Sequence, residues 1–148
     1  MNTAARLTEE IAKGRLCPGA TDLEQWLGAA WIRFPVGGFN LPVLPTFGLK
    51  RALVAHDVHH LLLAIPTTLR GEAEIAAWEL ASGGCGWNVA FWLDRLIVLV
   101  LGLLLAPTVT WRGLRRGFGQ RNLYGTPIRT SLASDTAELC GRMRVSVP

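Results

Sequence analysis

The chain has 148 residues, of which 50% are hydrophobic and 18% charged, and these values suit one globular domain with an ample core. The mean hydropathy of +0.30 is high, but no stretch reaches the roughly 20 apolar residues that a membrane-spanning helix needs, so we expect no integral membrane segment. The net charge of +4 would suit nucleic acid or an anionic membrane surface, and the distribution of charge has to decide between them.

The residues before position 49 carry few signals. Residues 1–15 have no apolar stretch between a basic start and a cleavage site, so we expect no secretory signal peptide. Three widely spaced cysteines without a Cys-x-x-Cys pair favour a reducing compartment. Asp22 can cap a helix that continues to Trp31, because apolar residues recur there at helical spacing. Residues 34–47 contain three prolines and two glycines and predict an irregular loop or arm.

Helical segments separated by turn residues follow from position 49. Thr67 or Thr68 can cap a helix that stops at Gly83 and Gly84. The other helices are predicted over residues 49–65, 87–106, 107–118 and 131–143. No segment shows the alternation that is typical of a strand. We therefore predict an all-α, single-domain bundle of five or six helices over residues 1–148.

The histidines of the chain are clustered, since all three fall within residues 56–60. His56 and His60 are four residues apart, so on a helix their rings lie one above the other, where two imidazole nitrogens can bind a single ion. Asp57 is turned by about 100 degrees from His56 and can be a ligand or an acceptor that orients an imidazole. His59 points elsewhere, and we expect it to be exposed or to lie behind the ligands.

A carboxylate can complete this site. Glu72 lies at the start of the next helix, and a tight turn at Pro66 can fold it back onto His56 and His60. Two imidazoles with one or two carboxylates suit zinc and also accept iron, cobalt or manganese. The alternative is a solvated helix face with ordinary helix-end charges, which the same spacing allows.

Other metal-binding motifs match only in part. A zinc peptidase would have a glutamate directly after the first histidine, where Asp57 stands. His-Asp phosphohydrolases use a further histidine upstream, and this chain has none before His56. A di-iron bundle would need two Glu-x-x-His motifs, and the chain has none. These three classes are therefore disfavoured.

The complete pattern, His-Asp-x-x-His followed by eleven residues and Glu, resembles the motif of the coenzyme Q biosynthesis protein 4 family. Here it reads HDVHHLLLAIPTTLRGE over residues 56–72. The resemblance continues through residues 71–74 and, more weakly, into the basic tract 111–117, within a motif region of 49–125. A constellation of four residues is much more specific than a histidine pair.

The resemblance implies an all-helical fold in which a zinc-like divalent ion is bound by the matching positions, His56, Asp57, His60 and Glu72. It also implies a peripheral role at the cytoplasmic face of a membrane, where the ring carboxyl of a prenylated hydroxybenzoate is replaced by a hydroxyl and other quinone-biosynthesis enzymes are organised. Asp57 or Glu72 would then move a proton. The chain is shorter than typical family members, which leaves homo-oligomer contacts and partner binding open.

The helix predicted over residues 87–106 is apolar nearly all round. Composition favours a core helix, whereas the functional interpretation is a lipid site in which a prenyl tail contacts Trp92, Leu96, Leu99 and Leu103. Residues 111–129 hold five arginines and no acid, which could rest on anionic lipid headgroups or form a solvated face. They are not interleaved with stacking aromatics, so we expect no nucleic-acid partner.

The sequence thus predicts a metal-binding, membrane-peripheral protein of ubiquinone biosynthesis that acts on the ring carboxylate of a prenylated hydroxybenzoate. The alternative is a non-catalytic scaffold that binds a prenyl lipid and uses the metal for structure. The number of ligands discriminates between them in principle, because four protein ligands close a zinc site and a catalytic site keeps one position open.

Overall fold

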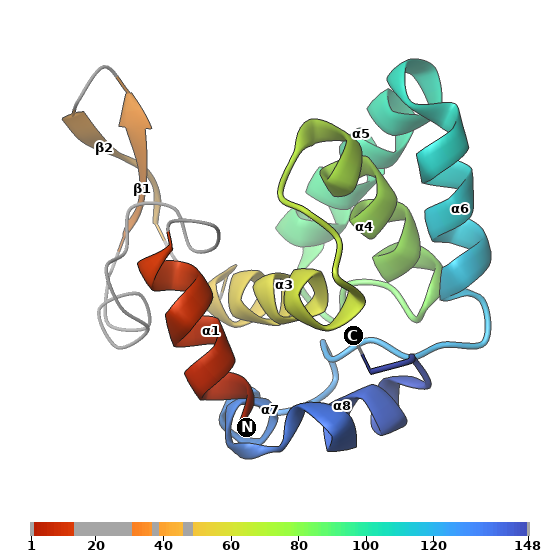
Figure 1. The fold of residues 1–148 in the computed structure, drawn as a ribbon. Coiled ribbons are helices and arrows are strands. Elements are labelled where there is room, and N and C mark those ends of the chain that lie inside the picture. The colour runs from red at the N-terminus through yellow and green to blue at the C-terminus, as the bar shows by residue number, and fades with distance from the viewer. Residues whose placement is uncertain (1, 14–30, 37–38, 46–48, 148) are drawn as a thin grey trace.

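The structure is a computed structural model that describes residues 2–13, 31–36, 39–45 and 49–147 (Figure 1). Within these residues the chain forms seven helices and one two-stranded sheet. The helices are α1 (Thr3–Ala12), α3 (Leu49–Leu63), α4 (Leu69–Ala81), α5 (Val89–Leu105), α6 (Pro107–Gly117), α7 (Ile128–Ala133) and α8 (Thr136–Met143). The predicted helical fold class is confirmed, with one helix more than the upper prediction.

The sheet corrects two predictions in the first third of the chain. Strands β1 (Trp31–Val36) and β2 (Phe39–Pro45) pair in antiparallel register, so most of residues 34–47 is a hairpin and not an irregular loop. In a two-stranded sheet each strand has a free edge, which tolerates the missing N–H of proline. Trp31 begins a strand and does not end a helix. The rest of the helix predicted from Asp22 lies outside the described residues.

A tight turn joins α3 to α4 and sets the position of both helices. Ala64 adopts a left-handed conformation with φ of 52°, and the Ile65 N–H donates to the His60 carbonyl at 3.1 Å, which ends α3. Thr68 caps α4 by accepting the Gly71 N–H at 3.2 Å, as predicted. A Cβ on Gly71 would lie 1.8 Å from the Pro66 carbonyl oxygen, so only glycine lets α4 begin against this turn.

Helices α4, α5 and α6 pack together on the side of α3 that is opposite to α1 (Figure 1). Gly113 and Gly117 allow α6 to approach α4 closely, because a Cβ at these positions would lie 2.2 Å from the Glu74 carbonyl oxygen and 2.6 Å from that of Trp78. The predicted ends of these three helices are confirmed to within two residues. In the described part of the chain, no helix has the length and hydrophobicity needed to cross a membrane.

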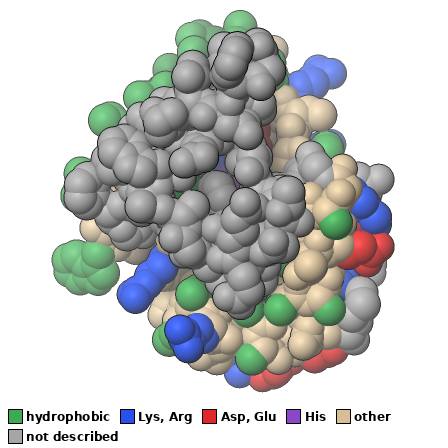
Figure 2. All heavy atoms as spheres, turned by 90° about the vertical axis from the view of Figure 1, so that its left-hand side faces the viewer, with side chains coloured by type: hydrophobic (Ala, Val, Ile, Leu, Met, Phe, Trp, Pro, Cys, Tyr) green, Lys and Arg blue, Asp and Glu red, His purple; other side chains and the backbone are tan. Residues whose placement is uncertain are grey.

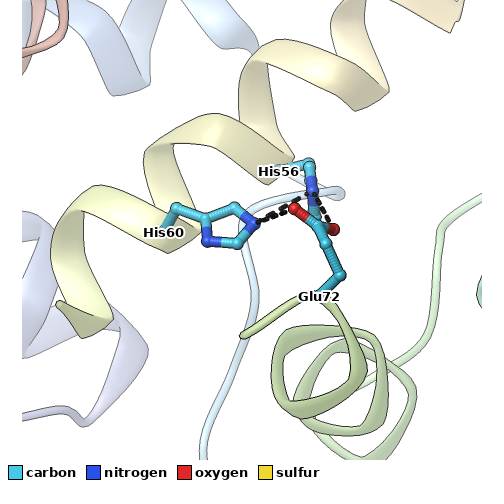
Figure 3. Close-up of side chains that lie close together, drawn as sticks. All are labelled: His56, His60 and Glu72. Atoms are coloured by element: carbon cyan, nitrogen blue, oxygen red, sulfur yellow. Dashed lines mark hydrogen bonds and ion pairs between the residues drawn. The ribbon is translucent and has the colours of Figure 1, made fainter. Parts of the chain in front are cut away.

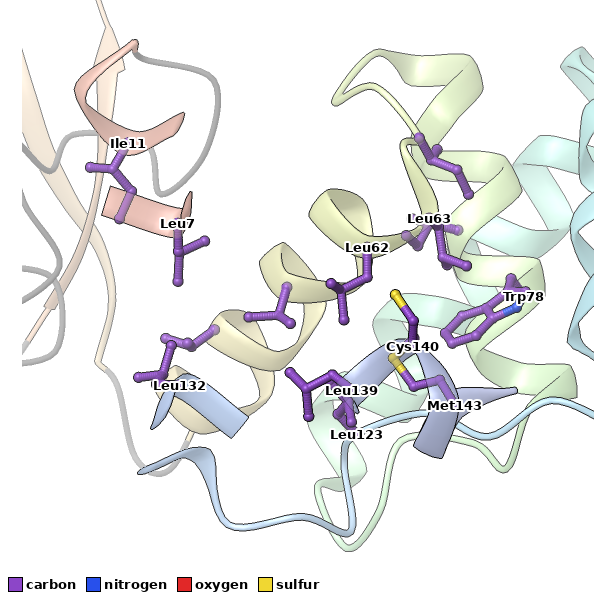
Figure 4. Close-up of a cluster of buried hydrophobic side chains, with 14 residues drawn as sticks. Leu7, Ile11, Leu62, Leu63, Trp78, Leu123, Leu132, Leu139, Cys140 and Met143 are labelled. Carbon is purple, nitrogen blue, oxygen red and sulfur yellow. The ribbon is translucent and has the colours of Figure 1, made fainter. Parts of the chain in front are cut away.

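The predicted last helix, residues 131–143, is two helices in the structure. Asp135 interrupts it, because its side chain accepts the Ala137 N–H at 2.8 Å and caps α8. Helix α1, which the sequence did not predict, begins at Asn2 through the same kind of cap. Together α1, α3, α4, α7 and α8 enclose the hydrophobic core drawn in Figure 4, which includes Leu7, Ile11, Leu62, Trp78, Leu132, Leu139 and Met143.

Candidate metal centre

Two histidines form one side of the site, and both project from α3. His56 and His60 are one helical turn apart and nearly buried, with 6% and 3% of their surface exposed. Their rings meet edge to face with centroids 4.6 Å apart, and the two Nε2 atoms lie 3.2 Å from each other. The helical spacing therefore brings the two imidazoles to a single point, as the sequence predicted.

Glu72, in the first turn of α4, forms the other side (Figure 3). Its Oε2 lies 3.3 Å from Nε2 of His56, and its Oε1 lies 3.2 Å from Nε2 of His60. One ligand atom from each of the three residues falls within 4.8 Å of the others, so this group could hold a metal ion. Gly71 lets α4 begin close to the turn, and Glu72, the next residue, therefore lies beside the histidines. In the structure the Glu72 carboxylate is folded back onto His56 and His60, as predicted.

Hydrogen bonds on the far side of each ring determine which nitrogen is available. His60 Nδ1 lies 2.9 Å from the Ile65 carbonyl oxygen, which can only accept, so Nδ1 carries the hydrogen. His56 Nδ1 lies 3.0 Å from Oε1 of Glu79. Arg95 Nη1, which can only donate, also lies 3.2 Å from His56 Nδ1, but the Glu79 oxygen is nearer to it and can only accept when ionised. With Nδ1 as the donor in both rings, each Nε2 is directed towards Glu72. Metal-binding histidines usually show this arrangement, in which the second nitrogen donates to an oxygen.

The donor set fits a divalent metal ion. Two imidazole nitrogens and a carboxylate are the ligands of several catalytic zinc sites, and they are also compatible with iron, cobalt or manganese. If these three residues were its only protein ligands, a bound zinc ion would keep a fourth position for water or substrate, as in catalytic zinc sites. A bound ion would act there as a Lewis acid.

Asp57 is 8% exposed and does not belong to the three-residue group that the structure brings together. Its position directly after His56 turns it away from the helix face that carries the two imidazoles. Its predicted roles as a fourth ligand and in proton transfer stay predictions.

The site includes polar residues that the sequence interpretation missed or misjudged. Glu79 and Arg95 lie beside Nδ1 of His56, the Tyr124 hydroxyl donates to Glu79, and Glu79 is completely buried. Glu79 follows Glu72 by seven residues, so two helical turns place both on one face of α4, a spacing that the sequence shows. His59 is fully buried against Glu79, which excludes the predicted exposed position and leaves the one behind the ligands.

The charges of the site are strongly coupled. Burial alone would lower the pKa of His56, but the charge of Glu79 and hydrogen bonds with Glu72 and Glu79 raise that pKa to about 10. Burial alone would raise the pKa values of Glu72 and Glu79, yet the histidines beside them hold both pKa values well below the usual range. In the absence of an ion, these neighbours therefore favour the protonated form of His56 at neutral pH.

A hollow of about 480 Å³ borders His60. It lies between α1 and the turn that joins α3 to α4, and it is lined by Arg6, Glu10, His60, Leu61 and residues 64–68. Arg6 and Glu10 add charges of opposite sign, and Thr67 and Thr68 add hydroxyl groups, to a wall that is otherwise mostly apolar. Such a mixture of apolar lining with a few polar groups is typical of sites for small organic ligands.

The lipid-contact residues predicted on α5 differ in their exposure, and their contact with lipid stays a prediction. On α5 only Phe91, Arg95 and Gly102 are buried. The prediction from composition that this helix belongs to the core is therefore wrong. Leu96 and Leu103 are 46% and 43% exposed, and Trp92 and Leu99 are partly buried. Hydrophobic side chains also gather along the upper left edge of the face shown in Figure 2.

Part of the basic tract has a structural partner. Arg112 and Arg116 lie 2.5 and 3.5 Å from the carboxylate of the nearly buried Glu74, which ties α6 to α4. Two of the five arginines for which contact with lipid headgroups was one interpretation therefore form ion pairs within the protein.

Comparisons of the sequence with known protein families and with curated proteins found no match. Among solved structures, a protein of Nostoc punctiforme PCC 73102 that is provisionally described as a ubiquinone biosynthesis protein aligns with a TM-score of 0.48 and 16% sequence identity. The alignment covers 95% of this chain and 80% of that one. A likeness at this level establishes neither a shared fold nor a shared activity.

Proposed function

We propose that this chain is a metal-binding, membrane-peripheral protein of ubiquinone biosynthesis, and that it acts on the ring carboxylate of a prenylated hydroxybenzoate. The observation that carries the proposal is the convergence of His56 Nε2, His60 Nε2 and the Glu72 carboxylate, with ligand atoms within 4.8 Å. These three residues also belong to the motif that resembles the coenzyme Q biosynthesis protein 4 family.

The number of ligands would decide between the catalytic form of this proposal and a purely structural metal. His56, His60 and Glu72 alone would leave one position for the substrate oxygen, whereas Asp57 as a fourth ligand would close a zinc site. The aromatic head would enter through the hollow beside His60, where Arg6 offers its charge to the carboxylate. Replacing a carboxyl group by a hydroxyl is a two-electron oxidation of the ring, so oxygen or a redox-active native metal must take up electrons that zinc cannot accept.

The prenyl tail and the membrane would meet the exposed apolar side chains of α5. Leu96 and Leu103 are two turns apart and share one face of the helix, which adds apolar area that can leave water on contact with lipid. Arg115, which follows on α6, can then lie near anionic headgroups. The same surface supports the second candidate, a scaffold that presents a prenyl lipid to other quinone-biosynthesis enzymes without chemistry of its own.

The test is a product analysis by mass spectrometry. The purified protein, loaded in turn with zinc, iron, cobalt or manganese, is incubated with oxygen, an external reductant and a prenylated hydroxybenzoate in detergent. We expect loss of the carboxyl group and gain of a hydroxyl with at least one metal, and no product with Glu72→Ala. Tight binding of the prenylated compound without any conversion would favour the scaffold.

A further inference from the structure

Glu79 accepts hydrogen bonds from three directions at a place that water does not reach. Its side chain is fully buried on α4, and its Oε1 lies 3.0 Å from His56 Nδ1, 2.7 Å from His59 Nδ1 and 2.6 Å from the Tyr124 hydroxyl. A buried carboxylate is unfavourable unless charges and donors surround it. The donors around Glu79 therefore stabilise its side chain as an ionised carboxylate.

A neighbouring backbone group fixes the direction of the bond between His59 and Glu79, whereas at His56 Nδ1 the guanidinium of Arg95 lies 3.2 Å away beside the Glu79 oxygen. The backbone N–H of Leu123 donates to His59 Nε2 at 2.9 Å, so this nitrogen is an acceptor and the hydrogen of the His59 ring sits on Nδ1, facing Glu79. His59 thus holds the carboxylate from one side while His56 meets it from the other. The second oxygen, Oε2, has no hydrogen-bond partner among the described residues, but Arg95 Nη1 lies 3.5 Å away and balances the charge.

We propose that Glu79 is the positioning residue of the metal centre, which holds His56 in the Nδ1–H form and turns its Nε2 towards the ion. The inference rests on the metal site of the proposed function and adds a residue to it. His60 is positioned by a backbone carbonyl, whereas His56 depends on a side chain, so the sequence at position 79 decides the donor strength and orientation of one ligand. His59 and Tyr124 keep the carboxylate in place.

A matched pair of variants separates this role from a structural one. Glu74 is also a nearly buried glutamate of α4, but within the described part of the chain its carboxylate pairs with Arg112 and Arg116 on α6 and with no histidine. Glu79→Gln retains the shape of the side chain and removes its charge, and Glu74→Gln does the same at the control position. The readout is the zinc dissociation constant, measured by competition with a chromophoric chelator.

We expect Glu79→Gln to weaken zinc binding by about 10- to 100-fold, as is typical when a residue that orients a metal ligand is changed. Glu74→Gln should leave the zinc dissociation constant unchanged, even where it lowers thermal stability. Equal zinc affinity in the Glu79→Gln variant and the wild type would overturn the inference and leave the metal site standing. A folded wild type that binds no zinc would instead overturn the proposed function, and the inference with it.

Because Arg95 loses a partner in Glu79→Gln, that variant can fail to fold, and a measurement on the wild type covers this outcome. Nitrogen-15 spectra of the histidine rings in the zinc-loaded protein distinguish the two tautomers directly. We expect the His56 hydrogen on Nδ1 with zinc on Nε2. A His56 ring that binds zinc through Nδ1, or carries its hydrogen on Nε2, would overturn the inference without any substitution.

Discussion

The surroundings of the candidate metal centre and the outer face of α5 have opposite characters. Around the metal centre, polar groups are buried: His56, His60 and Glu79 expose no more than 6% of their surface, and each has a hydrogen-bond partner. On α5, apolar groups are exposed: Ile97 and Leu104 expose 52% and 73%. Polar side chains inside and apolar side chains outside are both unfavourable for folding alone.

Each of these two regions contains residues that folding alone does not account for. Burying the site residues is tolerated because their polar atoms are paired, and an ion at the Nε2 atoms would complete the pairing. The exposed apolar side chains of α5 have no such pairing among the described residues, and covering them would stabilise this surface. The two regions should therefore respond independently to substitution, which the following predictions test.

The largest effect is expected for Gly71→Ala, which affects the site alone. The new Cβ would lie 1.8 Å from the Pro66 carbonyl oxygen, so α4 must shift and move Glu72 away from the histidines. We expect a loss of about 1–3 kcal/mol in the free energy of unfolding, measured with urea. Zinc affinity should fall by about tenfold or more, because ligands must be held to within a few tenths of an ångström.

Gly141→Ala is the matched control for this change. Gly141 lies inside α8, and nothing lies within 4 Å of the place that a new methyl group would take, so alanine should stabilise the helix by about 0.5–1 kcal/mol and leave zinc affinity unchanged. A Gly71→Ala protein with wild-type zinc affinity would show that the close approach at the turn does not position Glu72.

A smaller effect is expected from the double substitution Leu96→Ser and Leu103→Ser, which affects α5 alone. Both leucines are nearly half exposed, so the free energy of unfolding should change little. Binding to anionic vesicles, measured by sedimentation, should weaken by about tenfold because apolar area no longer leaves water. Leu69→Ser serves as the control, since Leu69 is 91% exposed at the start of α4. Unchanged vesicle binding in the double variant would contradict a lipid role for this face.

The smallest effect is expected from pH. The folded pKa of His56, about 10, exceeds its value of 6.5 in an unfolded chain, so its contribution to stability is complete below pH 6.5 and is lost as the pH rises towards 10. Metal-free protein should therefore become less stable to urea over this range. Zinc replaces the proton, so zinc-loaded protein should show a weaker decline. Identical pH profiles with and without zinc would contradict binding at His56.

Much of the helical framework could be predicted, because its signals are local. Thr68, Pro107 and the pair Gly83 and Gly84 mark helix ends through caps and backbone conformations that need no tertiary contact. The hairpin was missed because its prolines argue against a strand, and a two-stranded ribbon accepts them. Asp135 could have been recognised as a cap with Glu138 three residues later, a pattern that starts α8.

The candidate site was predictable in its ligands and not in its surroundings. His56, His60 and Glu72 follow from helical spacing and a turn, and both are visible in the sequence. Tyr124 and Arg95 come from distant segments, so nothing local predicts that they meet Glu79. The exposure of α5 was missed because an apolar helix in the core and one on the surface have the same composition, and only packing distinguishes them.

The most direct test of the central claim is the metal content of the purified protein by mass spectrometry, for the wild type, His60→Ala and Glu72→Ala, without chelator or an added affinity-tag metal. Because His56, His60 and Glu72 offer convergent ligand atoms, we predict close to one divalent ion per chain in the wild type and almost none in either variant. A folded, metal-free wild type, or variants that retain the ion, would contradict the proposed metal centre.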